Sequence, residues 1–371
     1  MARARHPDEI LVVSETGRYR AAALAGGRLI DVMTVPRDAK GAVGSLYLGR
    51  VVRRTPGMNA AFVEIGLERP AFLNLTKGTP EEGKPVVVQV VEAASAGKAS
   101  RVSMRIAIEG RFLVLLPREK GIAPSRRLAK DDAARLTGLV RPLLPSGEGI
   151  VLRAKARSAT ATEIKSELSV LRGLWQAAQR DGTPPMCLHV EPGLRHILCA
   201  FADARTKFTF GDAESARLAR AAAATIAPDL ASTIEATNEG AALFERGDVG
   251  DVLAASEGRE VMLPSGGRIS VEATTALVAI DVDSGAGSAD AEAVFTTNLE
   301  AADEAARQLR LRELGGTVVI DFIRMAGKGG REKVERRLAG AVAIDRMPVQ
   351  LLGWTRGGLY ELVRARRQGE S

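Results

Sequence analysis

Two matched apolar stretches, LVAID at residues 277–281 and TVVID at residues 317–321, decide the fold of the C-terminal part of the chain. Each stretch has the apolar character of a buried strand and ends in an aspartate. A helical pattern from about Asp290 to Glu313 separates them, and the glycine pair at 315–316 is expected to end that helix. A strand–helix–strand unit makes its two strands parallel and usually adjacent.

The matched strand ends predict that Asp281 and Asp321 lie side by side. Neighbouring strands are about 4.8 Å apart, so two carboxylates at this distance repel unless a cation or a proton lies between them. Two carboxylates, with water and substrate phosphate, typically hold Mg²⁺. If the strand continues, Asp283 lies on the same side of it as Asp281. There it would either be a third metal ligand or point at water or substrate. The alternative is that each aspartate only caps the turn or helix after its strand.

Charge is distributed unevenly along the 371 residues, although the net charge is only +7. Residues 101–160 contain 13 basic and 5 acidic side chains, whereas residues 201–300 contain 7 basic and 17 acidic ones. A basic block suits a polyanion such as nucleic acid, and an acidic block suits a divalent cation or a solvated helical surface. Arg126, Arg127 and Arg153 are candidate phosphate ligands, because guanidinium groups bind phosphate bidentately. A solvated charged edge is the alternative.

The composition also excludes several classes of protein. Two cysteines, Cys187 and Cys199, are too few for a disulfide framework or a four-cysteine zinc site. No window approaches the roughly 18 apolar residues of a membrane span. The polar N-terminus lacks the apolar stretch of a signal peptide. We therefore expect a cytoplasmic protein without a membrane partner.

Residues 44–104 show short strands separated by turns, which predicts a small β-barrel. Tyr47, Phe62 and Phe72 lie in this segment beside several arginines. Single-stranded nucleic acid binds such barrels by stacking bases on aromatic rings while basic residues hold the phosphates. On spacing alone, however, Phe62 and Phe72 are better explained as barrel core.

The remaining segments predict a mixture of helices and strands. Residues 161–180 form an amphipathic helix, and residues 213–260 are mostly helical. A last helix is expected at residues 331–344, followed by a last strand at residues 348–354.

Several motifs carry a resemblance to a known family. They are GSLYLGRVV (44–52), PGMNAAFVEIG (56–66), LPSGG (263–267), AID (279–281), TNLEAADE (297–304), RQLRLR (307–312), LGG (314–316) and VIDFI (319–323). In these motifs the chain resembles the ribonuclease E/G family. The similarity extends over nearly the whole chain, is weak between about 180 and 255, and is most specific from Thr297 to Ile323.

The resemblance implies a multidomain α+β and α/β fold. Residues 1–40 and 201–258 would form the two parts of an RNase H-like portion. Residues 41–108 would form an S1-type OB-fold domain that binds RNA, inserted into that portion. Residues 109–200 would form a 5′-sensor region, and residues 259–371 a DNase I-like catalytic portion that binds metal.

The resemblance also implies the activity. The family comprises magnesium-dependent endoribonucleases that cleave single-stranded RNA, process ribosomal and transfer RNA precursors, and start messenger decay. Mn²⁺ is an alternative cofactor, and the expected products carry 5′-phosphate and 3′-hydroxyl ends. Asp281 and Asp321 would be the metal ligands, with Asp283 beside them in the catalytic site.

Two further groups of residues follow from the same resemblance. Phe62, Phe72 and Lys98 would contact RNA, with Arg126 and Arg127 of the basic block as additional RNA-binding candidates. The residues implied to sense a 5′-monophosphate are Gly110, Val114 and Arg153.

The chain departs from the family pattern at three places. Asp283 stands where the family usually has Asn, which can donate a hydrogen bond to phosphate. Ala154 replaces the threonine of the sensor, which predicts weaker 5′-end discrimination. The cysteine motif that links protomers through zinc and the small C-terminal domain are absent, so we expect no zinc and no zinc-linked tetramer, whereas a homodimer is compatible. The alternative function is an RNA-binding protein of the same fold with weakened or lost catalysis.

Overall fold

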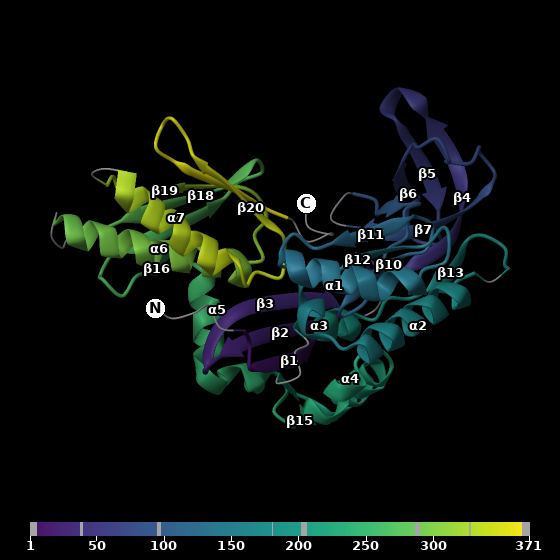
Figure 1. Cartoon of the computed structure of the whole chain (residues 1–371), viewed down its shortest axis with the longest axis horizontal. Helices are drawn as coiled ribbons and strands as arrows, with labels where there is room; N and C mark the ends of the chain where they lie inside the picture. Colours follow the sequence, from purple (N-terminus) through teal and green to yellow (C-terminus); the bar gives the residue numbers. More distant parts are fainter. Residues whose placement is uncertain are drawn as a thin grey trace.

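A computed structural model describes residues 6–37, 40–94, 98–179, 181–201, 206–285, 290–325 and 328–365. The fold is mixed α+β, and the strands within these ranges form four sheets. Figure 1 shows the barrel and the C-terminal sheet at opposite ends of the molecule, with the N-terminal sheet below them. The two chain ends assigned to predicted domains, 1–5 and 366–371, lie outside the described ranges.

The N-terminal sheet combines segments that are far apart in the sequence. Its strand order is β15-β14-β1-β2-β3. The strands are β1 (Glu9–Glu15), β2 (Arg18–Ala25), β3 (Arg28–Pro36), β14 (Lys207–Phe210) and β15 (Ile234–Ala236). Helices α3 (Gly193–Phe201) and α4 (Ala213–Ile226) pack on one face, and α5 (Val249–Glu257) packs on the other. Both faces are therefore buried.

The expectation of a mostly helical segment over residues 213–260 is only partly correct. Helix α4 ends at Ile226 because Pro228 cannot continue a helix. Short 3₁₀ segments (Pro228–Thr233 and Gly240–Asp248) and strand β15 follow before α5 begins.

A five-stranded barrel confirms the prediction for residues 44–104. Its strands are β4 (Leu46–Thr55), β5 (Ala60–Glu64), β6 (Ala71–Asn74), β7 (Pro85–Glu92) and β8 (Arg101–Ser103). They pair in the order β4-β5-β6-β8-β7, and β7 pairs back with β4, which closes the barrel in an OB-like arrangement. Strand β13 (Met186–His189) adds to β4 from outside. Gly49 is required where β4 and β5 approach closely, since a Cβ there would lie 2.5 Å from Val63 Cγ1.

A four-stranded sheet follows the barrel in the sequence. Its order is β11-β12-β10-β9. The strands are β9 (Ile108–Glu109), β10 (Leu113–Leu116), β11 (Gly121–Pro124) and β12 (Gly149–Leu152), accompanied by α1 (Lys130–Val140) and α2 (Ala161–Ala177). Helix α2 begins at a capping box in which Thr160 and Glu163 satisfy each other's backbone N–H groups. It places the apolar stripe of Ile164, Leu168 and Leu171 in the core that the sheet shares.

The C-terminal sheet contains the two matched stretches, and it confirms that they are parallel neighbours. Its order is β16-β17-β18-β19-β21-β20, with β18 parallel to β19. The strands are β16 (Glu260–Met262), β17 (Arg268–Ala273), β18 (Leu277–Asp283), β19 (Gly316–Asp321), β20 (Val349–Trp354) and β21 (Tyr360–Arg364). Helices α6 (Ala291–Leu311) and α7 (Lys328–Val342) share the core of this sheet (Figure 1).

Two expectations for this part of the chain are wrong. Helix α6 ends at Leu311, and the left-handed backbone falls on Glu313 (φ 51°), whereas Gly316 already begins β19. The strand at residues 349–354 is not the last, because a turn at residues 355–358 leads into β21, which inserts between β19 and β20.

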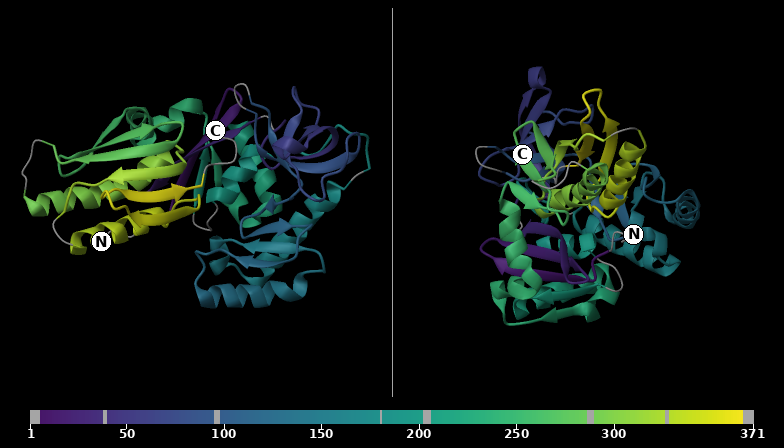
Figure 2. Two further views of the ribbon diagram at one scale, coloured as in Figure 1. Left: turned by 90° about the horizontal axis from the view of Figure 1, so that it is seen from above. Right: turned by 90° about the vertical axis from the view of Figure 1, so that its left-hand side faces the viewer.

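Helix α6 joins the C-terminal sheet to the N-terminal sheet. Arg307 and Arg310 donate hydrogen bonds of 2.8 and 2.9 Å to the carbonyls of Leu29 and Ile30 in β3. The right-hand view of Figure 2 shows this stacking of sheet, helices and sheet. None of the helices in the described ranges is both long and apolar enough to span a membrane.

Candidate functional site

Asp281 and Asp321 are register partners, and Asp321 ends β19 whereas β18 continues past Asp281 to Asp283. Both side chains are exposed, whereas Ile280 and Ile320, one residue earlier, are buried. Because side chains alternate along a strand, burial of the isoleucines under α6 and α7 directs both aspartates to the opposite face. The structure therefore brings the two predicted carboxylates together on an accessible face.

Helix α6 fixes the strand ends that carry these aspartates. Asn298 is fully buried, and its amide donates to the Ile323 carbonyl (2.9 Å) and accepts from the Ile323 N–H (3.0 Å). Two residues further along α6, Glu300 accepts a hydrogen bond of 2.9 Å from the backbone N–H of Ser265, in the turn that precedes β17. The TNLEAADE motif thus holds both sides of the carboxylate pair.

Asp283 lies on the same face as Asp281, but hydrogen bonds already engage both of its oxygens. Oδ1 accepts from the Gly285 N–H (2.8 Å), and Oδ2 accepts from Arg268 Nη2 (2.8 Å). These contacts, the Gly285 hydrogen bond first and then the Arg268 charge, lower the pKa of the Asp283 carboxyl. Across the described part of the chain, no three His, Cys, Asp or Glu side chains gather as a metal cluster.

Phe62 and Phe72 lie on the outside of the barrel, so the preference for a core position is wrong. Their neighbours along the strands, Ala61, Val63, Ala71 and Leu73, fill the barrel core together with Tyr47. Phe62 and Phe72 are half-buried cross-strand partners whose ring centroids lie 6.1 Å apart, edge to face.

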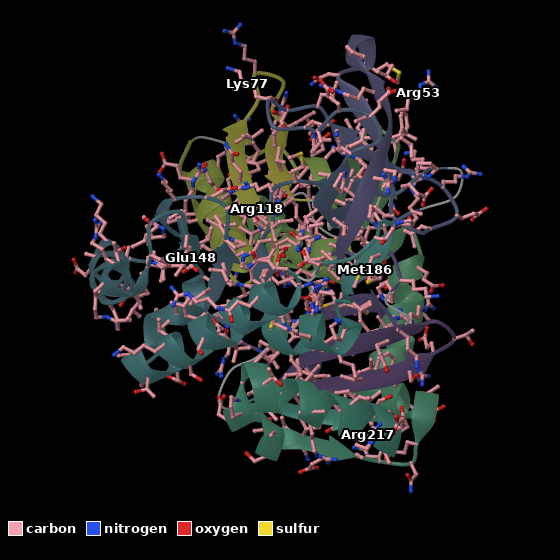
Figure 3. The ribbon with its side chains drawn as sticks, turned by 90° about the vertical axis from the view of Figure 1, so that its right-hand side faces the viewer. Arg53, Lys77, Arg118, Glu148, Met186 and Arg217 are labelled. Atoms are coloured by element: carbon pink, nitrogen blue, oxygen red, sulfur yellow. The ribbon has the colours of Figure 1, made fainter. Side chains whose placement is uncertain are left out.

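Two arginines extend this aromatic pair into a continuous row across four strands. Arg53 in β4 is the register partner of Phe62, and Arg101 in β8 is the register partner of Phe72. Both arginines are exposed, and the Arg101 guanidinium lies 6.0 Å from the Phe72 ring centroid. Figure 3 shows Arg53 directed away from the barrel. The row Arg53–Phe62–Phe72–Arg101 combines stacking surfaces with cations, as a single-strand binding surface requires.

The other predicted RNA-binding residues are placed differently from one another. Lys98 and Arg126 are exposed. Arg127 donates to the carbonyls of Asp345 and Met347, which links the four-stranded sheet to the C-terminal part of the chain.

The predicted sensor residues Gly110, Val114 and Arg153 come together around β9, β10 and β12. Arg153 Nη1 donates to the Gly110 carbonyl (2.7 Å), and its backbone N–H donates to the Phe112 carbonyl (2.8 Å). Val114 pairs with Glu109 on one side and with β12 on the other. The guanidinium also lies 3.6 Å from the carboxylate of Glu109.

Glu167 supports this loop, although the sequence interpretation missed it. Its buried carboxylate accepts hydrogen bonds from three consecutive backbone N–H groups, those of Arg111, Phe112 and Leu113. Burial raises the pKa of Glu167, and the three N–H donors oppose that rise. A Cβ on Gly110 would lie 2.6 Å from the Glu167 carboxylate carbon, so only glycine fits there. A glutamate within the apolar stripe of α2 is the signal that could have revealed it.

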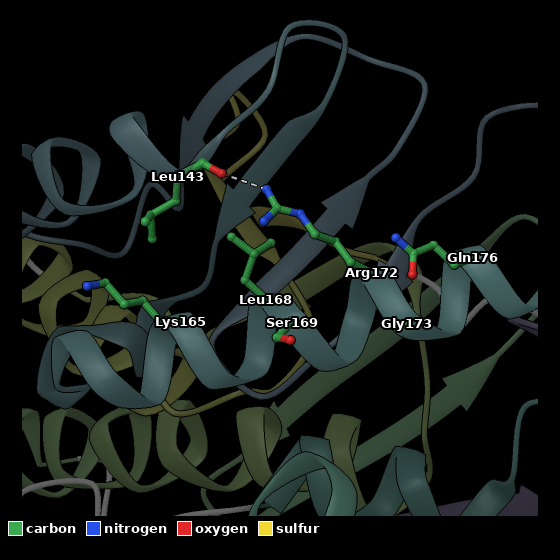
Figure 4. Close-up of a pocket in the computed structure, with 7 residues that line it drawn as sticks. All are labelled: Leu143, Lys165, Leu168, Ser169, Arg172, Gly173 and Gln176. Carbon is green, nitrogen blue, oxygen red and sulfur yellow. Dashed lines mark hydrogen bonds between the residues drawn. The ribbon is translucent and has the colours of Figure 1, made fainter.

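A separate pocket lies along α2. Leu143, Lys165, Leu168 and Arg172 are among its lining residues (Figure 4). Arg172 donates to the Leu143 carbonyl (2.7 Å) and to Glu148. The pocket contains none of the predicted site residues.

Comparison with known proteins identifies the family. The model of the ribonuclease E/G family matches residues 107–367. The chain belongs to the ribonuclease E/G family. This family member is 34% identical to ribonuclease E of Escherichia coli. The alignment covers 96% of the present chain and 36% of ribonuclease E. The chain is 30% identical to ribonuclease G of Haemophilus influenzae and to ribonuclease G of E. coli, over 79% and 80% of those chains.

The coverage differs between the two kinds of relative. This family member spans little more than a third of ribonuclease E, but about four fifths of ribonuclease G. In both cases the alignment includes the barrel, the four-stranded sheet and the paired aspartates, because it covers 96% of the chain.

Proposed function

We propose that this ribonuclease E/G family member is an endoribonuclease that cleaves single-stranded RNA by metal-assisted hydrolysis. The observation that carries the proposal is the pairing of Asp281 with Asp321 at adjacent strand ends, on an exposed face of the sheet. The ribonuclease names of the relatives support RNA as the substrate.

The donor chemistry of this site fits Mg²⁺. Two carboxylates in register, open to solvent, leave room for the water and phosphate oxygens that Mg²⁺ retains in its coordination. Mn²⁺ takes the same oxygen donors, and a zinc site is not expected. When bound, the cation would supply positive charge that polarises the scissile phosphodiester and offsets the charge that develops on it.

The protein's own side chains would bind and orient the RNA. The barrel row would stack successive bases of a single strand, and basic side chains such as Lys98 and Arg126 would hold phosphates. In the cleavage step, a water oxygen forms a bond to phosphorus and the bond from phosphorus to the 3′-oxygen breaks. A proton passes to the 3′-oxygen, so the products carry a 3′-hydroxyl and a 5′-phosphate end.

We also propose the domain assignments and the biological setting. Residues 1–40 and 201–258 would be the RNase H-like portion, 41–108 the S1-type domain, 109–200 the 5′-sensor region and 259–371 the DNase I-like portion. Precursors of ribosomal and transfer RNA, and messenger RNA, would be the cytoplasmic substrates. A homodimer is compatible with these assignments.

The direct test is cleavage of an end-labelled single-stranded RNA with Mg²⁺, with Mn²⁺ and with excess chelator. We expect cleavage with either metal, none with chelator, and none of a DNA strand of the same sequence. Cleavage of DNA at a similar rate would indicate a metal-dependent DNase instead. RNA binding without cleavage would favour the second candidate, a binding protein, which is motivated by the engagement of Asp283 with Arg268.

Replacing Phe62 or Phe72 with alanine is expected to weaken single-stranded RNA binding by roughly 5- to 150-fold each, because base stacking contributes ~1–3 kcal/mol per base. Phe→Tyr at the same positions keeps the ring and should bind within about threefold of the parent. Fluorescence anisotropy with a labelled oligonucleotide in chelator measures binding without cleavage. Equal affinity of the alanine and tyrosine variants would refute stacking at this row.

Ala154→Thr is expected to increase the preference for a 5′-monophosphate over a 5′-hydroxyl by ~10-fold. The substitution restores a hydroxyl donor next to Arg153, and a hydrogen bond to a charged group contributes ~1.5–3 kcal/mol. The measurement is the ratio of cleavage rates on two RNAs that differ only at the 5′ end. A large preference in the parent itself would contradict the expected weak discrimination.

A further inference from the structure

Arg268 and Asp283 form an ion pair across β17 and β18, beside the paired aspartates. They are register partners, and Arg268 Nη2 lies 2.8 Å from Asp283 Oδ2. Both side chains remain accessible, with 42% of the Arg268 side chain and 44% of the Asp283 side chain exposed. The pair therefore lies on the solvent-accessible face on which Asp281 and Asp321 also lie.

The hydrogen bonds of Asp283 make it unsuited to bind phosphate directly. An ionised carboxylate has no donor, and its two oxygens already accept from Gly285 and Arg268. Arg268, in contrast, has five N–H donors. Nη2 donates to Asp283, and Nη1 lies 3.9 Å from Glu260 Oε2, beyond hydrogen-bond distance. The guanidinium thus retains donor capacity on the exposed face.

The position of Arg268 relative to Asp281 is fixed by the strand register. Ser270 is opposite Asp281, and Arg268 lies two residues earlier, at the start of β17, on the same face. Diagonal neighbours in such a ladder are about 7–8 Å apart at Cα, within reach of a long side chain. Gly267, the preceding residue, is packed tightly, since a Cβ there would lie 2.7 Å from the Asp283 carbonyl. The start of β17 is therefore held firmly against the end of β18.

We propose that Arg268 binds the scissile phosphate next to the paired aspartates, and that Asp283 is the positioning residue that orients its guanidinium. This inference rests on the proposed nuclease function. The Arg268 charge offsets that of Asp283, so this carboxylate repels a phosphate less than an unpaired one would, although Glu260 Oε2 also lies 3.9 Å from Arg268 Nη1. Together the two side chains supply the donor that an asparagine at position 283 supplies in the usual family pattern.

A double-mutant cycle tests the inference on the full chain. Arg268→Ala is expected to lower kcat/KM for single-stranded RNA by about 10- to 100-fold, because it removes a charge-assisted hydrogen bond and leaves Asp283 unpaired beside the phosphate. Asp283→Asn alone is expected to lower kcat/KM by about three- to tenfold, because a neutral amide holds the Arg268 guanidinium less firmly than the carboxylate does. In the double variant the amide can face the phosphate, so kcat/KM should recover about tenfold relative to Arg268→Ala.

Arg259→Ala is the matched control, because Arg259 is an exposed arginine that pairs with Glu272 on the same hairpin. It should cleave within about twofold of the parent. The inference is overturned if Arg268→Ala cleaves as fast as this control, or if the double variant is no faster than Arg268→Ala. If the parent cleaves RNA and Asp281→Asn does not, either of these two failures would refute only the role of Arg268. A parent that does not cleave would overturn the proposed function and this inference together.

Discussion

Asparagine in place of Asp281 or Asp321 is expected to slow RNA cleavage by roughly 100- to 1,000-fold, because a metal ion contributes several kcal/mol to stabilising the transition state. The substitution keeps the size of the side chain but removes the negative charge that a hard cation requires. The two aspartates are register partners, so each variant leaves only one carboxylate of the pair. We therefore expect similar losses for both.

Cleavage rates over a range of Mg²⁺ concentrations, with a labelled single-stranded RNA, measure this effect. Asp303→Asn is the control, because Asp303 lies on α6 and forms a partly exposed ion pair with Arg337 (2.8 Å). The control should remain within about twofold of the parent. RNA affinity in chelator should be unchanged in all three variants. The metal assignment is wrong if Asp281→Asn and Asp321→Asn both cut as fast as the parent.

Glu191→Ala is expected to lower the free energy of unfolding by about 3–5 kcal/mol. Glu191 and Arg195 are each about 5% exposed, and Arg195 Nη1 donates to both carboxylate oxygens, at 2.7 and 2.9 Å. The pair also joins three parts of the molecule, since the Glu191 N–H donates to Ser45 Oγ (3.0 Å) and Arg195 donates to the Glu109 carbonyl. Removal of the carboxylate would leave a buried guanidinium without its counter-ion.

The same pair predicts a pH dependence. Burial alone would raise the pKa of the Glu191 carboxyl, but Arg195, with His189 and His196, lowers it from 4.5 to about 2. Because the pKa is lower in the folded state, the pair stabilises the fold fully above about pH 4.5, and this contribution is lost as pH falls toward 2. The shift corresponds to roughly 3 kcal/mol.

Urea unfolding between pH 3 and pH 7 measures both effects. Glu214→Ala is the control, because Glu214 forms an exposed ion pair with Arg217 on α4, and it should leave the unfolding midpoint nearly unchanged at each pH. The parent should lose stability relative to Glu191→Ala as the pH falls below about 4.5. An unchanged difference between the two proteins across this range would contradict the assignment.

The sequence predicted the carboxylate pair because both strands are local patterns joined by one helix. Chain topology alone then makes the strands parallel, and the matched aspartates become neighbours without any knowledge of tertiary contacts. The barrel was predictable for the same reason, since its strands follow one another in the sequence.

The contacts that the sequence did not reveal join distant segments. Glu167 binds N–H groups more than 50 residues earlier, and Arg127 binds carbonyls more than 200 residues later. Contacts between residues so far apart in the sequence leave no periodic pattern from which they could be predicted. The sequence does not predict the outward position of Phe62 and Phe72, because a strand of alanines, valines and phenylalanines is similarly hydrophobic on both faces. Small residues at positions 61 and 71 fill the narrow barrel, which excludes the larger rings.

The divided N-terminal sheet has a consequence for how the chain is made. Strand β1 pairs with β14, whose first residue is synthesised about 200 residues later. At 5–20 residues per second, this interval is roughly 10 to 40 seconds on the ribosome. The last strand of the barrel ends at Ser103, about 100 residues before β14, so the barrel can close while β1 still lacks its parallel neighbour. One edge of the N-terminal sheet therefore has to wait for a segment that is synthesised only after the barrel.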